Sequence, residues 1–521
     1  MISGSTRRLA AAIMPLVISG WTGAAAAAHP AVESCGGFSA NRGEGVQNAR
    51  AMSRADEHKI ESFLQRADAT PGVSIAIVKG DEIIYARGFG YRDLADCSRA
   101  TSQTRYYLKS TTKNFLGAAA AVLHEEGAIE LDAPISDYLP ELKLPDGLRP
   151  EQVSIRAHLT HTQPYYDAGL NYRTAFPGNL AEEDFIDHVN EFSESKDIRF
   201  RYSNFGPIMA AHAIGAKTGV NWRELIAEKV FAPAGMSDSF TVMAEAEQGE
   251  MAQGYMGGFD AAYRPEMTKV DSQMHAAGGA VSTAADMARW LIVNLNQGVI
   301  DGEQVFPRHA ITQIHAPQAQ LQANFQDYDR YAYGLGLYSA EYEGDVLMHH
   351  LGGETHMSFM PERSLGVVVL TNELDNGVWV THALASTIYD MLLGKSDVDA
   401  RIERRLAAIA DGKTRVAGRL EQYLAMVRDK APDGPPVFSR TDITGAYRND
   451  RLGDLSIVEA ADGLVVEYGV IKGALSHVGG DLYLADIGLW NSLPPQRFTF
   501  RTDETLGFIL NWDGRIFEPI D

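Results

Sequence analysis

Apolar residues form short runs near both ends of the central part of the chain, and each run is typical of a β-strand. The predicted strands cover residues 73–78, 82–86, 346–350, 357–360 and 365–370. The first two surround the turn Lys79-Gly80-Asp81, which predicts a hairpin. Helical segments separate the early strands from the late ones, so we expect one sheet that both ends of the domain complete.

Segments with helical periodicity lie around and between these strands. Residues 54–68 predict a helix that leads into the domain, and another helix begins after Thr283, which has capping-box spacing to Asp286. Residues 399–430 predict a charged amphipathic helix. From about residue 440 to 521, short alternating runs separated by turns predict a small all-β module, and we expect a barrel.

Length and charge narrow the possible classes of protein. The chain has 521 residues, of which 45% are hydrophobic, so two or three domains with a large core are expected. Its formal net charge of −22 argues against nucleic acid or an anionic membrane as a partner.

The N-terminus has the pattern of an export signal. Arg7-Arg8 precede the apolar run 9–21, and small residues 24–28 offer a cleavage site after Ala28. We therefore expect a periplasmic or secreted protein with no membrane anchor after cleavage. Its only cysteines, Cys35 and Cys97, either form a disulfide or are two unpaired thiols.

The tetrad Ser110-Thr111-Thr112-Lys113 is the strongest candidate for catalytic chemistry. Residues i and i+3 share a helix face, and a lysine shielded from water can take the proton of a serine hydroxyl. An alanine-rich apolar segment follows and ends at Gly127, which predicts a buried helix with a glycine cap. A second copy, Ser193-Glu194-Ser195-Lys196, lies in a charged run and predicts a solvated loop.

Two further segments supply the other groups that acyl transfer needs. Tyr202-Ser203-Asn204 offers a phenol and an amide, and a lysine ammonium beside the tyrosine would lower its pKa. His350-Leu351-Gly352-Gly353 follows a predicted strand, where glycines let backbone N–H groups approach a substrate oxygen.

With these motifs in this order, the chain resembles the penicillin-recognising serine hydrolases, which include class C β-lactamases, DD-peptidases, D-aminopeptidases and esterases. The likeness covers about residues 55–395 and includes Ala277–Asp286 and Tyr333–Gly336. It implies that Ser110 is the nucleophile and that Lys113 and Tyr202 transfer protons. It also implies that Asn204, His350, Gly352 and Gly353 orient the substrate, with the N–H groups of Ser110 and Gly353 as the oxyanion hole.

The resemblance also implies a fold and a division of the chain. The expected fold is α/β (α+β), with an antiparallel sheet flanked by helices, a mostly helical lobe and then a small barrel similar to lipocalin-like domains. The expected parts are a signal peptide (1–28), an N-terminal extension (29–54), the hydrolase domain (55–395), a helical linker (396–439) and the barrel (440–521). The family needs no cofactor and no metal.

Departures from the family pattern indicate which substrates to expect. His350 stands where lysine is usual, which argues against a dedicated β-lactamase. Gln163-Pro164-Tyr165 and Tyr166 replace a smaller segment, so that wall of the pocket is expected to be bulkier and more aromatic. In the family the third motif is usually Lys-Thr-Gly, which Lys217-Thr218-Gly219 also spells. A helix end capped by Gly219 explains this match better.

The expected function is that of an exported serine hydrolase that cleaves an ester or a peptide amide, including an amide beside a D-residue. Its substrate is a small molecule or peptide, and the sequence leaves the oligomeric state open. The alternatives are a β-lactamase or penicillin-binding DD-peptidase, and a catalytically silent binding or sensor protein of the same fold. The histidines at 349, 350 and 356 with Glu354 could suggest a metal cluster, but neighbouring strand residues point to opposite faces.

Overall fold

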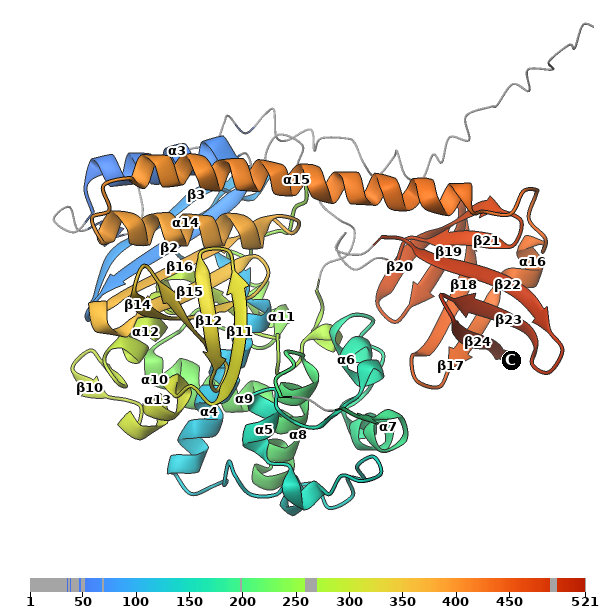
Figure 1. Ribbon diagram of the computed structural model, residues 1–521, viewed down its shortest axis with the longest axis horizontal. Coiled ribbons are helices and arrows are strands. Elements are labelled where there is room, and N and C mark those ends of the chain that lie inside the picture. Colours follow the sequence, from blue (N-terminus) through green and yellow to red (C-terminus); the bar gives the residue numbers. More distant parts are fainter. Residues whose placement is uncertain are drawn as a thin grey trace, which may run out of the picture.

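The computed structural model describes residues 35, 38, 46–47, 52–67, 70–196, 199–257, 269–487 and 494–520. The described chain forms a large body and a small barrel, joined by one long helix (Figure 1). The predicted signal peptide and most of the predicted extension lie outside the described residues. Among the described helices, none has both the length and the apolar character needed to cross a bilayer.

A ten-stranded antiparallel sheet forms the centre of the large body. Its strands lie in the order β1 (Val46–Gln47), β3 (Glu82–Asp93), β2 (Gly72–Lys79), β16 (Leu365–Thr371), β15 (Thr355–Met360), β14 (Asp345–Leu351), β13 (Tyr338–Tyr342), β12 (Tyr328–Tyr333) and β11 (Ala319–Phe325), with β4 (Ser98–Arg99) beside β3. Val73 of β2 lies opposite Thr371 of β16, so both ends of the domain complete the sheet. The five predicted strands and the predicted closure are confirmed.

Helices cover both faces of the sheet, which explains the unbroken apolar run in β16. Val367 and Val369 pack with α3 (Arg54–Ala67) and α14 (Gly377–Leu392) on one face. Val368 and Leu370 pack on the other face with the helices that carry the candidate site. A strand buried on both sides must be apolar at every position.

The second face holds α4 (Thr112–Glu125), α12 (Ala284–Leu295) and a helical lobe. The lobe lies below the sheet in Figure 1 and contains α5 (Ile155–Leu159), α6 (Ala168–Ala175), α7 (Phe185–Phe192), α8 (Phe205–Thr218) and α9 (Trp222–Ile226). The remaining short elements of the body are β5 (Arg105–Tyr107), β6 (Tyr165–Tyr166), β7 (Glu194–Ser195), β8 (Val281–Thr283), β9 (Val299–Ile300), β10 (Glu303–Gln304), α10 (Ala232–Ala234), α11 (Met243–Ala246) and α13 (Arg308–His315).

Only half of the predicted capping box forms at the start of α12. Thr283 Oγ1 accepts a hydrogen bond from the Asp286 N–H at 3.1 Å, as predicted. The Asp286 carboxylate instead accepts from the Asp238 N–H and the Ser239 hydroxyl, both at 2.8 Å. The carboxylate therefore ties the helix to a neighbouring loop.

The C-terminal module is a closed eight-stranded barrel, which confirms the expected fold class. Its strands are β17 (Gly445–Asn449), β18 (Gly453–Ala460), β19 (Gly463–Tyr468), β20 (Ile471–Gly479), β21 (Leu482–Ala485), β22 (Gln496–Asp503), β23 (Gly507–Trp512) and β24 (Arg515–Ile520), preceded by the short helix α16 (Arg440–Ile443). Alternating residues fill the interior, where Phe498, Phe500 and Phe517 are fully buried.

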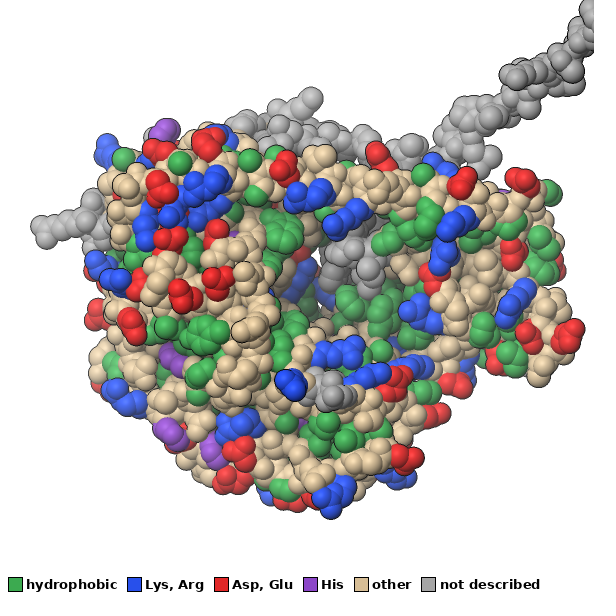
Figure 2. All heavy atoms as spheres, in the orientation of Figure 1, with side chains coloured by type: hydrophobic (Ala, Val, Ile, Leu, Met, Phe, Trp, Pro, Cys, Tyr) green, Lys and Arg blue, Asp and Glu red, His purple; other side chains and the backbone are tan. Residues whose placement is uncertain are grey.

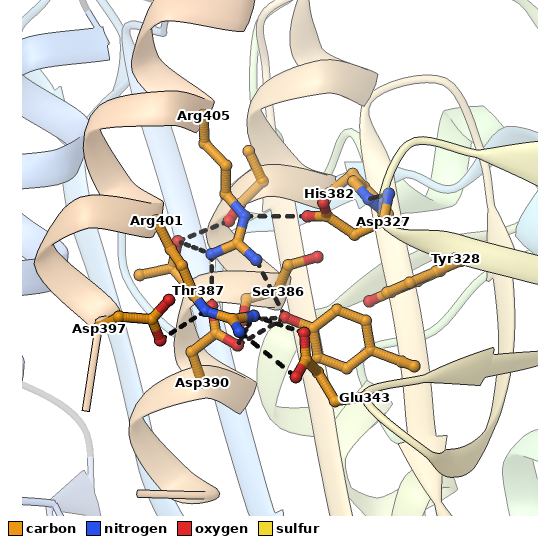
Figure 3. Close-up of polar contacts among 12 residues, drawn as sticks. Asp327, Tyr328, Glu343, His382, Ser386, Thr387, Asp390, Asp397, Arg401 and Arg405 are labelled. Atoms are coloured by element: carbon orange, nitrogen blue, oxygen red, sulfur yellow. Dashed lines mark hydrogen bonds and ion pairs between the residues drawn. The ribbon is translucent and has the colours of Figure 1, made fainter. Parts of the chain in front are cut away.

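One helix of 32 residues, α15 (Val398–Asp429), runs from the body to the barrel (Figure 1). At 1.5 Å per residue it is about 48 Å long. Figure 3 shows Arg401 and Arg405 pointing from α15 toward Asp390 on α14. Arg405 donates to Asp390 Oδ2 at 2.7 Å and to Asp327 Oδ2 at 2.9 Å. These buried contacts fix the first third of the helix to the body.

Arginines are numerous along α15, and blue side chains lie along the helix in Figure 2. A groove of about 750 Å³ is lined by Arg401, Arg404, Arg405, Arg415 and Arg419, with Trp379 among the apolar residues. Its lining residues come from α15 and from the α14 side of the sheet.

Cys35 and Cys97 form a disulfide, which decides between the two possibilities that the sequence left open. The bond ties a residue before the first helix to the loop between β3 and β4. In the chain-entropy picture, closing such a loop disfavours the unfolded chain by about 4 kcal/mol.

Candidate active site

Ser110 lies in the 3₁₀ turn η1 (Lys109–Thr111), which leads directly into α4. Lys113 follows in the first turn of that helix and is 1% exposed. Its Nζ lies 3.0 Å from Ser110 Oγ, so the contact expected from the spacing is present. The apolar residues of α4 are buried in the core, which holds this end of the helix in place.

Three oxygen atoms surround the Lys113 amine: Ser110 Oγ at 3.0 Å, Asn204 Oδ1 at 2.8 Å and the Ala277 main-chain oxygen at 2.8 Å. Burial lowers the pKa of Lys113 well below its ordinary value, which favours the neutral amine. Amide and main-chain oxygens only accept hydrogen bonds, so they take the two N–H groups of a neutral amine. Its lone pair is then left for the Ser110 hydroxyl.

Tyr202 and Asn204 lie in the loop before α8, beside this amine. The Tyr202 ring centroid is 4.9 Å from Lys113 Nζ. Although 37% of Tyr202 is exposed, the burial of its phenol end raises its pKa. The expected fall in this pKa is therefore not found, because burial disfavours the charged phenolate.

His350 lies on β14 and faces the same group of side chains. Its Nδ1–H donates to the Leu351 main-chain oxygen at 2.9 Å, and its Nε2 lies 3.3 Å from the Tyr333 hydroxyl. Burial lowers the pKa of His350 well below its ordinary value. A neutral imidazole thus stands where the family usually has a charged lysine.

Gly352 and Gly353 follow β14 and pass close to the nucleophile turn. A Cβ on Gly352 would lie 1.9 Å from the Leu108 main-chain oxygen, so only glycine fits there. Gly353 has a φ of +80°, which also favours glycine. The N–H groups of Gly352 and Glu354 bond within the loop, to the oxygens of Thr355 and Gly352. The oxyanion role of the Gly353 N–H remains a prediction.

Side chains that the motifs do not contain join these two segments. Lys109, directly before Ser110, forms an ion pair with Glu354, directly after Gly353. Thr111 Oγ1 lies 3.1 Å from Thr355 Oγ1, and the Thr355 hydroxyl donates to the Leu108 oxygen at 3.1 Å. Glu354 is 4% exposed, and its burial raises the pKa of the carboxyl. The pair holds the nucleophile turn against the glycine loop, and the sequence analysis missed it.

An aromatic group closes the site on the side of β12 and β13. The rings of Tyr333 and Tyr338 lie 6.2 Å and 6.0 Å from that of Tyr202. His161 lies 4.8 Å from the Tyr202 ring, is fully buried and has no hydrogen-bond partner on either ring nitrogen. In the sequence, only the segment Tyr333–Gly336, which resembles the family, indicated this aromatic group.

The expected aromatic wall after Thr162 is only partly present. Tyr165 is fully buried in the core, where its hydroxyl lies 2.8 Å from His158 Nε2. Its bulk therefore packs the lobe and does not line the pocket. Tyr166 is half-buried, with the Arg201 guanidinium 4.2 Å from its ring centroid.

The other candidates have structural explanations. Gly219 ends α8 with a φ of +74°, as a cap requires, so the Lys217–Gly219 match belongs to a helix end. The second Ser-x-x-Lys copy includes the exposed two-residue strand β7 where we expected a loop. Within the ranges that the structure describes, no three His, Cys, Asp or Glu side chains are grouped so as to hold a metal ion.

Alignments with two related proteins cover most of the chain. The unguisins hydrolase ungD' of Aspergillus campestris is 24% identical over 419 residues, which are 74% of each chain. Protein flp of Staphylococcus aureus is 24% identical over 362 residues, which are 64% of this chain and 68% of the relative.

Solved structures show the same fold. The octameric penicillin-binding protein homologue from Pyrococcus abyssi superposes with a TM-score of 0.57 at 23% identity, covering 89% of this chain and 99% of its own. The D-amino acid amidase from Ochrobactrum anthropi SV3 gives a TM-score of 0.52 at 21% identity, covering 65% of this chain and 99% of its own. The β-lactamase family matches residues 59–385. The chain therefore belongs to the β-lactamase-fold family of hydrolases.

Proposed function

We propose that this protein is a serine hydrolase that cleaves an amide or ester bond through an acyl-enzyme on Ser110. The observation that carries this proposal is the Lys113 amine, whose two obligate acceptors leave its lone pair for the Ser110 hydroxyl. A serine with a base already in contact is an activated nucleophile.

The proposed reaction uses these groups in turn. Ser110 Oγ attacks the carbonyl carbon while its proton passes to Lys113 Nζ, and the N–H groups of Ser110 and Gly353 receive the oxyanion. When the bond to the leaving group breaks, that group takes the Tyr202 proton, and the new Lys113 ammonium returns a proton to the phenolate. Water then attacks the acyl carbon and gives its proton to Lys113, which returns one to Ser110 as the ester bond breaks.

The site favours peptides and esters over antibiotics as substrates. Neutral His350 offers no fixed positive charge to the carboxylate of a β-lactam. A relative is named a hydrolase, and a structural neighbour is named a D-amino acid amidase, which supports an amide substrate beside a D-residue.

The test combines labelling with a substrate panel. Mass spectrometry after a fluorophosphonate probe should place one adduct on Ser110, and Ser110→Ala should abolish both the adduct and turnover. The panel contains p-nitrophenyl esters, D- and L-aminoacyl anilides and nitrocefin. Fast nitrocefin turnover would favour a β-lactamase. A labelled serine without turnover on any substrate would favour a silent binding protein.

We also propose that the protein is exported, to the periplasm or the medium. The N-terminal pattern and the Cys35–Cys97 disulfide support this, because disulfides persist in oxidising compartments. The mature protein from the cell envelope or medium should begin at His29 and contain the disulfide. An intact chain with reduced cysteines in the cytoplasm would contradict export.

A further inference from the structure

The barrel packs against α6, the helix of the lobe that lies nearest to it in Figure 1. The Tyr172 ring of α6 lies 6.1 Å from the ring of Tyr468 and 6.2 Å from that of Trp512, both in the barrel. Just after α6, the Pro177 main-chain oxygen accepts a hydrogen bond from the Val470 N–H at 2.9 Å. The barrel thus contacts the middle of this helix and the turn that follows it.

A buried polar group fixes the other end of α6 to the barrel. Asp167 caps the helix, since its Oδ1 accepts from the Gly169 N–H at 2.8 Å. Its Oδ2 lies 2.6 Å from His188 Nδ1, and His188 Nε2 lies 2.9 Å from the Arg451 main-chain oxygen. Asp167 is fully buried, and His188 is 5% exposed. The imidazole therefore bridges the lobe and the barrel.

The same helix holds the loop of the candidate site. Asn171 Oδ1 accepts a hydrogen bond from the Asn204 N–H at 2.9 Å. Asn204 Oδ1 in turn accepts from Lys113 Nζ at 2.8 Å. Asn171 and Tyr172 are neighbours on α6, so one helix contacts the barrel and the loop that orients the Lys113 lone pair.

We propose that Asn171 is a positioning residue and that the barrel, by fixing α6, keeps Asn204 on Lys113. This inference rests on the proposed acyl-enzyme at Ser110, and it gives the barrel a part in catalysis. A loop displaced by a fraction of an ångström misdirects the amine lone pair, which slows the chemical step more than substrate binding.

The first test compares two asparagines that each accept a hydrogen bond from a backbone N–H. Asn171→Ala should lower kcat for a p-nitrophenyl ester roughly tenfold, with KM changed less than twofold. Asn190 accepts from the Lys143 N–H on the lobe surface, so Asn190→Ala is the matched control and should leave both constants unchanged. An unchanged kcat in a folded Asn171→Ala protein would overturn the proposal.

The second test works from the barrel. Arg451 lies 3.0 Å from Glu194 and 3.8 Å from Asp167, so Arg451→Ala weakens the docking. It should lower kcat roughly threefold, and its effect should not add to that of Asn171→Ala, because both act through α6. Arg497→Ala removes an exposed arginine paired with Asp513 elsewhere on the barrel, and it should have no effect. Full additivity of the Arg451 and Asn171 variants would overturn the coupling.

Amide hydrogen exchange separates this inference from the proposed function, because it needs no turnover. Peptides that cover residues 199–206 should exchange faster in Arg451→Ala and in Tyr172→Leu, and at the wild-type rate in Arg497→Ala. If Ser110→Ala keeps activity while exchange changes as expected, only the proposed function fails. If Ser110→Ala is inactive but exchange and kcat are unchanged in the α6 variants, only this inference fails.

Discussion

Ser-x-x-Lys occurs twice in this chain, and the two copies lie in opposite surroundings. Lys113 is buried at the start of α4, in contact with Ser110 and two further oxygens. Lys196 follows the short strand β7, where its side chain is 38% exposed and pairs with Glu194 at 2.7 Å. The same four-residue pattern thus gives an amine with a free lone pair in one place and a solvated ion pair in the other.

The surroundings, not the spacing, produce this difference. Burial disfavours the charged amine, and the fixed acceptors Asn204 and Ala277 orient the neutral one. Lys196 is exposed to water beside the Glu194 carboxylate, so it is neither buried nor held by fixed neutral acceptors.

Removing the two serines should separate the copies most clearly. Ser110→Ala removes the nucleophile and should lower kcat/KM about ten-thousandfold or more. Ser193→Ala, the matched change in the second copy, should leave kcat/KM within twofold of wild type. Steady-state assays with a p-nitrophenyl ester measure both. Comparable losses in the two variants would erase the contrast.

Arginine in place of each lysine tests whether the amine acts as a base. Arginine cannot lose its proton in a protein, so Lys113→Arg should lower kcat about a thousandfold although it keeps a basic side chain. Lys196→Arg keeps the charge that the exposed pair uses and should be neutral. The same ester assay gives the answer, and an active Lys113→Arg enzyme would show that Lys113 supplies only charge.

The ion pair beside the first copy should matter to a smaller degree. Glu354→Gln removes the charge that pairs with Lys109 and loosens the turn that holds the Ser110 N–H, so kcat should fall roughly tenfold. Glu126→Gln breaks an exposed pair with Lys229 just after α4 and serves as the control. Equal kcat values in the two variants would show that the ion pair of Lys109 and Glu354 does not help to hold the site.

The burial of Lys113 should also make the stability of the protein depend on pH. The pKa of Lys113 is lowered by folding, so below pH 10.5 the unfolded chain binds one proton that the folded protein does not. Lys113 therefore reduces the free energy of unfolding as pH falls from 10.5, by at most about 1.4 kcal/mol per pH unit. Relative to wild type, Lys113→Met should gain stability from pH 10 to pH 8 in urea titrations, and Lys196→Met should not. A pH-independent difference for Lys113→Met would mean that its amine is charged in the folded protein.

Much of the fold could be predicted from the sequence, because the burial of an element determines the pattern of apolar residues within it. A strand covered on both faces must be apolar throughout, as β16 is, and a barrel strand alternates. The first copy of the tetrad could be preferred over the second for the same reason, since α4 is apolar on all sides. The expected antiparallel sheet and closed barrel are both present.

The rest of the site depends on contacts that no local pattern records. The Ala277 oxygen is a main-chain atom, so its contact with Lys113 leaves no signal in residue type. Lys109 and Glu354 meet across 245 positions of sequence. The direction of the Tyr202 pKa shift depends on the burial of the phenol, which the motif does not state. Tyr165 matches an aromatic pocket wall equally well in sequence, yet it points into the core.

The junction of β2 and β16 has a consequence for how the chain reaches its native state. The Thr371 hydroxyl donates to the Gly72 main-chain oxygen at 2.8 Å, across 299 positions of sequence. The central pair of the sheet therefore forms only after nearly the whole body has been synthesised, and such distant pairing makes folding slow. Until then, the hairpin of β2 and β3 exposes an apolar edge on which chains can associate. Conditions that delay β16 should therefore lead to aggregation before they reduce the activity of molecules that have folded.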